Sequence, residues 1–119
     1  MKNAEKDLGP RTKQFARRVI RLFVALPNDT AAQVLGKQLL RSGTSVGANY
    51  REANRGRSKA EFIAKIGDCL KEADESAYWI ELLRDENFLP AARLQPLLDE
   101  ANELVAIFVT ISKRAKGEM

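Results

Sequence analysis

Histidine is absent from this 119-residue chain, and cysteine occurs only once, as Cys69. Without histidine the chain cannot build a Ser-His-Asp or Cys-His catalytic set, and it lacks the commonest metal ligand of proteins. A single cysteine excludes a disulfide within the chain and is typical of a reducing compartment. Cys69 lies on an apolar helical stripe, where a free cysteine is usually a small buried side chain. We therefore predict no catalytic residue, no metal site and no cofactor.

Long apolar runs are also missing. No stretch reaches the ~18 apolar residues of a membrane span, and the first residues, MKNAEKDLGPRTK, lack the apolar core of a signal peptide. We expect a cytoplasmic protein with no membrane partner. Proline is scarce, hydrophobic residues make up 45% of the chain and charged residues 30%. This length and composition predict one helical domain over residues 1–119.

Hydrophobic periodicity predicts four helices, over about 11–26, 31–54, 59–87 and 90–114. The first carries an apolar stripe from Phe15 to Leu26, and the segment Pro27-Asn28-Asp29-Thr30 ends it and offers a cap for the second. Ser58, followed three residues later by Glu61, matches a capping box for the third, after Gly56 as a C-terminal cap residue of the second. Pro90 suits the first turn of the fourth. Amphipathic helices joined by short turns predict an up-down-up-down antiparallel four-helix bundle, an all-α fold.

The second predicted helix is unusual because it keeps several glycines. Each glycine in a helix interior costs about 1 kcal/mol relative to alanine, so this stripe predicts a close approach of two backbones. The stripe consists of Gly36, Leu40, Gly43, Gly47 and Tyr50. A heptad seam runs beside it and contains Asn49, which we expect to hydrogen-bond a neighbouring helix.

The fourth predicted helix contains LVAIFVTI, from Leu104 to Ile111, which is apolar nearly all round and includes the seam residue Phe108. Such a segment is buried on more than one side. A small bundle hides one face of each helix, so the pattern predicts that the chain assembles with copies of itself.

The residues from Gln38 to Ala53, QLLRSGTSVGANYREA, followed by Gly56-Arg57, resemble the four-helix-bundle proteins encoded in bacterial 23S rRNA intervening sequences. The family pattern is met at Gln38, Leu39, Arg41, Ser45, Asn49, Glu52, Gly56 and Arg57. Ala53 stands where the family has glycine, and Tyr50 where it has isoleucine. A related bundle is the accessory protein of diversity-generating retroelements. The resemblance implies a barrel-like homopentamer with a basic surface, and in the retroelement branch nucleic-acid association.

Two acidic pairs resemble another pattern. Glu72 with Glu75, and Glu100 with Glu103, are spaced like the acids that bind Mg²⁺ in all-α nucleotide pyrophosphohydrolases of the MazG type. Magnesium favours carboxylate and phosphate oxygens, so this chemistry is coherent. However, the four glutamates flank the apolar seams rather than lie on them, which disfavours an enzyme.

Charge is unevenly distributed along the chain. Residues 1–65 hold 14 Lys/Arg and 5 Asp/Glu, whereas residues 66–119 hold 6 and 11. Arginine and lysine suit phosphate contacts that carry no sequence choice. The candidate nucleic-acid-binding residues are Lys13, Arg17, Arg18, Arg21, Arg41, Arg51, Arg55, Arg57 and Lys59. The expected function is a non-enzymatic accessory or scaffold protein that binds RNA or DNA. The alternative is that these charges pair with the acidic half, within one subunit or between subunits, for example with Asp68, Glu72 and Glu75 of a neighbour, leaving a protein scaffold without nucleic acid.

Overall fold

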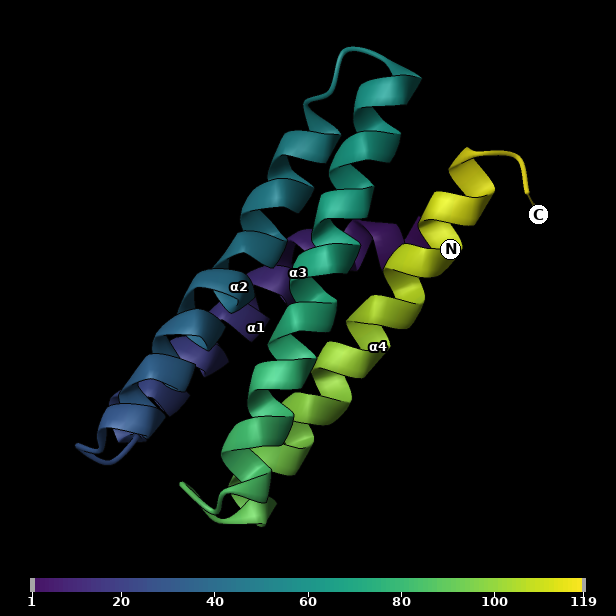
Figure 1. The fold of residues 1–119 in the computed structure, drawn as a ribbon. Helices are drawn as coiled ribbons and strands as arrows, with labels where there is room; N and C mark the ends of the chain where they lie inside the picture. Colours follow the sequence, from purple (N-terminus) through teal and green to yellow (C-terminus); the bar gives the residue numbers. More distant parts are fainter. Residues whose placement is uncertain (1, 119) are drawn as a thin grey trace.

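The computed structural model is an all-α bundle of four helices and describes residues 2–118, with side chains from residue 8 onward. The helices are α1 (Lys2–Ala25), α2 (Thr30–Asn54), α3 (Lys59–Asp85) and α4 (Ala91–Ala115). Figure 1 shows α2, α3 and α4 side by side, with α1 behind them. The bundle is elongated, with extents of 45 × 22 × 20 Å. The predicted all-α fold class is confirmed.

Local capping explains where α2 and α3 begin. The Asp29 carboxylate accepts a hydrogen bond from the Ala32 backbone N–H at 3.0 Å, and the Ser58 hydroxyl accepts one from the Glu61 N–H at 3.1 Å. Each bond satisfies one of the free N–H groups of a first helical turn. The cap predicted at Ser58 is confirmed, and within the segment 27–30 that was predicted to cap α2 the capping residue is Asp29. The predicted starts of α2 and α3 lie within one residue of the observed ones.

The first helix is longer than predicted, because it begins at Lys2 rather than near Arg11 and includes Pro10. Leu8 is fully buried and extends the apolar stripe of α1 toward the N-terminus. Proline removes one backbone hydrogen bond from a helix interior. The burial of Leu8 helps to hold the helix on both sides of Pro10. Sequence reasoning stopped at Pro10 and therefore missed the first turns.

Two other helix ends differ from expectation. The third helix ends at Asp85 because Asn87 adopts a left-handed backbone, with φ of 59°, which is typical of a residue just past a helix C-terminus. Gly56, in contrast, follows the α2 cap residue Arg55 without adopting a left-handed φ. Pro90 is the residue before α4, not its first, and provides no side-chain cap.

The apolar stripes of the four helices form one core, which includes Phe15, Leu39, Ile80 and Phe108. Packing is extensive between α2 and α3 and between α3 and α4, and α1 packs mainly on α2. Among the described residues, α1 meets α4 over a much smaller area. In Figure 1, α1 crosses behind the other helices from the α2 side toward α4. The stripe predicted for α4 lies in the core, where Leu94, Ala101, Leu104 and Ile111 are buried.

The glycine stripe of α2 packs against α1 of the same chain. A Cβ added at Gly43 would lie 2.8 Å from Val19 Cγ2, and one at Gly47 would lie 3.2 Å from Thr12 Oγ1. At Gly36 an added Cβ would overlap Leu26. The close backbone approach predicted from the stripe is therefore present within one subunit. It needs no second copy of the chain to explain it.

The polar contact between α2 and its neighbouring helix is made by Ser42 rather than by Asn49. Asn49 is half-buried, and its side chain makes no hydrogen bond within the described structure. The prediction that Asn49 bonds a neighbouring helix is therefore wrong. Instead, the hydroxyls of Ser42 on α2 and Ser76 on α3, both fully buried, lie 2.9 Å apart. Serine fits there because a short hydroxyl can pair across two closely packed helices.

Candidate nucleic-acid interface

A row of basic residues follows the solvent-exposed side of α1. Lys13, Arg17 and Arg21 are exposed and recur every four residues, which places them about 6 Å apart along the helix axis. From Leu8 to Ala25 the helix contains no acidic residue at all. This face of α1 therefore presents positive charge without a local counter-charge.

A groove of about 630 Å³ between α1 and α2 extends this basic face. Lys13 from α1 and Arg51 from α2 both line it, together with Gly47, whose missing side chain lets the two backbones approach. Tyr50 also lines the groove, but it is 95% buried and packs against Phe108 at 6.3 Å between ring centroids. The groove thus joins the basic residues of two helices.

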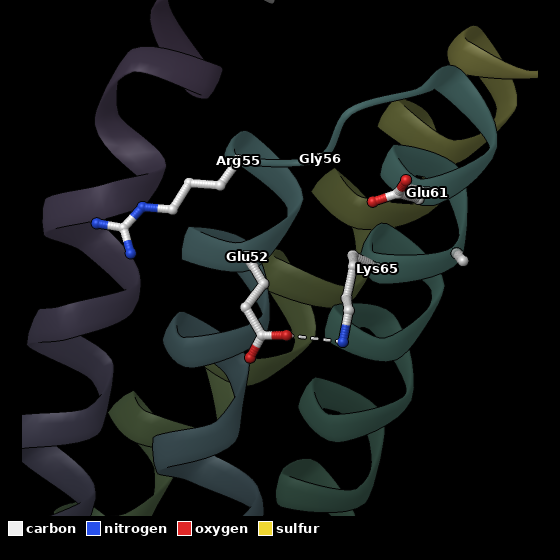
Figure 2. A pocket seen from close by; sticks show the side chains of 6 residues that line it. Glu52, Arg55, Gly56, Glu61 and Lys65 are labelled. Carbon is white, nitrogen blue, oxygen red and sulfur yellow. Dashed lines mark ion pairs between the residues drawn. The ribbon is translucent and has the colours of Figure 1, made fainter.

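The turn between α2 and α3 adds further charges, because Arg55, Arg57 and Lys59 are all exposed there. Figure 2 shows the Arg55 side chain extending toward α1, away from the neighbouring pair of Glu52 and Lys65. That pair is an ion pair of 2.8 Å, and its hydrogen bond raises the pKa of Lys65. Arg55 has no acidic partner in the part of the chain that the structure describes, so its charge is available to a ligand.

Arg41 differs from the other candidates because it is engaged within the chain. Its guanidinium lies 3.0 Å from Glu75 and 3.5 Å from Glu72, both on α3. Arg41 therefore links α2 to α3, and part of its charge is already neutralised. The sequence left open whether basic and acidic residues pair within one subunit or between subunits, and for Arg41 the structure shows the pairing within one.

Arg11 and Arg93 are among the arginines that were not selected from the sequence. Arg11 makes a bidentate pair with Glu100, at 2.7 and 2.8 Å, and a longer contact of 3.3 Å with Glu103. The hydrogen bonds to Glu100 raise the pKa of Arg11 despite its partial burial. Arg93, at the start of α4, lines a small hollow with Arg18 and Arg21. No local sequence signal connects Arg93 with residues of α1, because only the packing of α1 beside α4 brings them together.

The MazG-like pattern of glutamates does not converge on one site. Glu72 and Glu75 share Arg41, whereas Glu100 and Glu103 share Arg11. Among the described residues, no group of three acidic or cysteine side chains is arranged to hold a metal ion. Each pair of glutamates is thus partly neutralised by an arginine, so the arrangement gives no support to a magnesium site.

Cys69 is fully buried on α3, as its place on the apolar stripe predicted. Burial raises the pKa of the thiol to about 12. A thiol is nucleophilic as the thiolate, so we expect buried Cys69 not to react at neutral pH. Its role in the structure is to fill space between α3 and its neighbours.

A sequence model of the 23S rRNA-intervening sequence proteins matches residues 8–110. The chain belongs to this family. It is also similar to a solved structure, that of a protein with unknown function from the S23 ribosomal protein family from Bacteroides thetaiotaomicron. The two are 37% identical over 89% of this chain and 98% of that one, with a TM-score of 0.83. No curated protein matches the chain. No helix in the described residues is long and apolar enough to cross a membrane.

The motif that carries the family resemblance lies on a different face from the α1 row. Arg41, Ser45, Asn49 and Glu52 follow one another along α2 at helical spacing. Both ends of this motif pair with α3, through Arg41 with Glu72 and Glu75 and through Glu52 with Lys65. Arg41 and Glu52 of the intervening-sequence motif thus support the α2–α3 contact, whereas Arg51 of the same segment lines the α1–α2 groove.

Proposed function

We propose that this intervening-sequence protein is a non-enzymatic accessory or scaffold protein that binds the phosphate backbone of RNA or DNA. The observation that carries the proposal is the α1 face, which holds Lys13, Arg17 and Arg21 without an acidic partner among the residues that the structure describes. Arg51 extends it across the α1–α2 groove, and Arg55 extends it toward the α2–α3 turn. Among the described residues, the ion pairs lie elsewhere, at Arg11, Arg41, Lys65 and Arg84.

The chemistry of this face favours phosphates over bases. Proteins that hold unpaired bases stack them on aromatic side chains. Here Tyr50 is the aromatic residue that lines the groove, and it is buried against Phe108. Lysine and arginine contacts to a phosphate backbone release counterions and give affinity without sequence choice. We therefore expect salt-dependent binding with little preference for sequence.

The proposal includes assembly into a homo-oligomer, with a pentamer as the form that the family resemblance implies. On α4, Val105 and Ile107 are only partly buried against the core of one chain, and Val109 is half-buried. On α3, Tyr78 is 54% exposed. Apolar surface of this kind is covered when copies associate. Light scattering should give a mass several times 13.3 kDa, and a monomer mass would refute this part.

The third part of the proposal is that the protein is not an enzyme. It rests on the two pairs of glutamates, Glu72 with Glu75 and Glu100 with Glu103, which contact different arginines. A magnesium-dependent pyrophosphohydrolase needs carboxylates that converge on its metal, whereas here one pair of glutamates contacts Arg41 and the other contacts Arg11. Incubation of the protein with mixed nucleoside triphosphates and Mg²⁺ should release no pyrophosphate. Release that depends on Glu72 or Glu100 would overturn this part of the proposal.

The binding experiment uses fluorescence anisotropy with labelled duplex RNA, single-stranded RNA and duplex DNA over a salt series. The test variant replaces Lys13, Arg17 and Arg51 with glutamine. Log Kd rises with log salt at about 0.9 per phosphate contact on B-DNA. If all three side chains contact phosphates, the variant should lower that slope by about 3.

A matched control removes the same charge elsewhere. Lys71→Gln, Lys113→Gln and Lys116→Gln together bring the net charge from +4 to +1, as the test variant does. These three lysines are exposed and lie on α3 or near the C-terminal end of α4. The control should keep most of the wild-type affinity and slope. Equal losses in both variants would show that only net charge matters, and the α1 face would not be the binding site.

A protein scaffold without nucleic acid is the second candidate. Val24, 77% exposed, and Ile20, 44% exposed, lie on α1 beside the basic row. An apolar patch rimmed by charge is also typical of a protein interface. If the wild-type protein binds none of the three nucleic acids at low salt, this alternative replaces the proposal.

A further inference from the structure

Three arginines gather at the boundary between α1 and α4. Arg18 and Arg21 from α1 and Arg93 from α4 line a hollow of about 140 Å³. Its remaining lining is apolar and consists of Leu22 and Leu97, which are 6% and 3% exposed. Arg93 thus shares one small site with two arginines that lie at least 72 residues before it in the sequence.

These three charges lack any counter-charge within the part of the chain described here. None of the three has a carboxylate within ion-pair distance. Arg93 is moreover the third residue of α4, at the positive end of the helix dipole, where acidic residues are favoured. The first turn of α4 has no acidic residue, and Pro90 gives it no side-chain cap. Like charges placed together beside a helix N-terminus repel one another, so the arrangement favours a bound anion.

We infer that Arg18, Arg21 and Arg93 form a binding site for a single phosphate group. The planar guanidinium presents paired N–H donors that match phosphate oxygens. The hollow is smaller than the about 300–1,000 Å³ of pockets that enclose drug-sized ligands, so it suits one phosphate rather than a whole nucleotide. The phosphate belongs either to a nucleic-acid backbone, in which case the inference rests on the proposed function, or to a free phosphate compound.

The first experiment measures phosphate binding without nucleic acid. Sodium phosphate is titrated into the full chain by calorimetry, and the melting temperature is followed in phosphate and in chloride at equal ionic strength. Wild type should show saturable binding and a melting temperature raised by phosphate. Arg93→Gln should weaken phosphate binding about tenfold, as expected for a lost charge-assisted hydrogen bond. Arg93→Lys should restore part of the affinity, because it keeps the charge but not the fork.

Two controls separate a binding role from a structural one. Arg114→Gln, at the far end of α4, removes the same charge and should leave phosphate binding unchanged. Without phosphate, Arg93→Gln should melt at the wild-type temperature or above it, because the substitution relieves repulsion. An arginine that merely supports the fold would lower the melting temperature when replaced.

Several outcomes would overturn the site. It fails if phosphate does not bind wild type, or if phosphate stabilises wild type and Arg93→Gln equally, which would indicate an ionic effect only. It also fails if Arg93→Gln changes the assembly mass while phosphate has no effect, because the hollow would then be a contact between copies.

A nucleic-acid arm distinguishes the source of the phosphate. If Arg93→Gln also lowers the salt slope for duplex binding by about 1, the occupant is a backbone phosphate. If phosphate binds but no nucleic acid does, the site stands with a free phosphate compound as its ligand, and the proposed function fails. If nucleic acid binds wild type and phosphate does not, the proposed function stands without this site.

Discussion

Gly43→Ala tests a close contact between α1 and α2. The new Cβ would lie 2.8 Å from Val19 Cγ2 and 3.0 Å from Cγ1. Val19 is fully buried and β-branched, so it has little freedom to turn aside. Replacing a mid-helix glycine with alanine gains about 1 kcal/mol of helix stability, but overpacking costs about 1–3 kcal/mol. The net expectation is a change between about zero and 2 kcal/mol of destabilisation.

Gly67 provides the matched control, because it lies on an exposed part of α3 and an added Cβ there would meet nothing within 4 Å. Gly67→Ala should therefore show the helix gain alone, about 1 kcal/mol of stabilisation. Urea denaturation at one fixed protein concentration measures both variants, because assembly makes stability depend on concentration. The difference between the two variants isolates the packing cost at the α1–α2 contact.

The decisive measurement is a double-mutant cycle with Val19→Ala. Removing the Val19 methyls leaves space for the new Cβ, so in that background Gly43→Ala should stabilise, as Gly67→Ala does. The coupling free energy should be about 1–3 kcal/mol. If Gly43→Ala stabilises the otherwise unchanged protein as much as Gly67→Ala, then α1 does not pack on α2 as described, and the account of the glycine stripe is refuted.

Three further predictions follow from other contacts. Because its thiol pKa is raised to about 12, Cys69 should react with a thiol reagent at pH 8 only after unfolding. The free energy of unfolding should also decline above about pH 8.5 and continue to fall toward pH 12, because the thiol ionises in the unfolded chain but not in the folded one. Cys69→Ala should reduce this decline. Rapid labelling of the native protein would contradict this. Ser42→Ala and Ser76→Ala should each cost about 1 kcal/mol in urea denaturation, whereas the double variant should cost less than the sum; strict additivity would show that the two hydroxyls do not interact. Arg11→Gln should cost about 1 kcal/mol, since its pair with Glu100 is only partly shielded, and should speed hydrogen exchange in α1; unchanged exchange would mean that the pair does not secure α1 to α4.

Much of the fold follows from short-range sequence rules. Apolar spacing located the core faces of all four helices, because a helix repeats every 3.6 residues whatever it packs against. The segment 27–30 and Ser58 marked helix starts, since a cap depends on residues only a few positions away. The first turns of α1 escaped prediction because Pro10 weighs locally against a helix, whereas the burial of Leu8 in the tertiary core favours one.

For the candidate site, too, the sequence determined some features and the tertiary packing determined others. From sequence alone, the periodicity of α1 and its lack of acids between Leu8 and Ala25 determined a basic helix face, and family membership followed from the motif around Arg41. The tertiary structure decided which charges remain free, since Arg41 pairs across to α3 and Arg11 to α4. It also placed Arg93 beside Arg18. Ion pairs and pockets depend on distances between residues far apart in the chain, and only the packed bundle sets those distances.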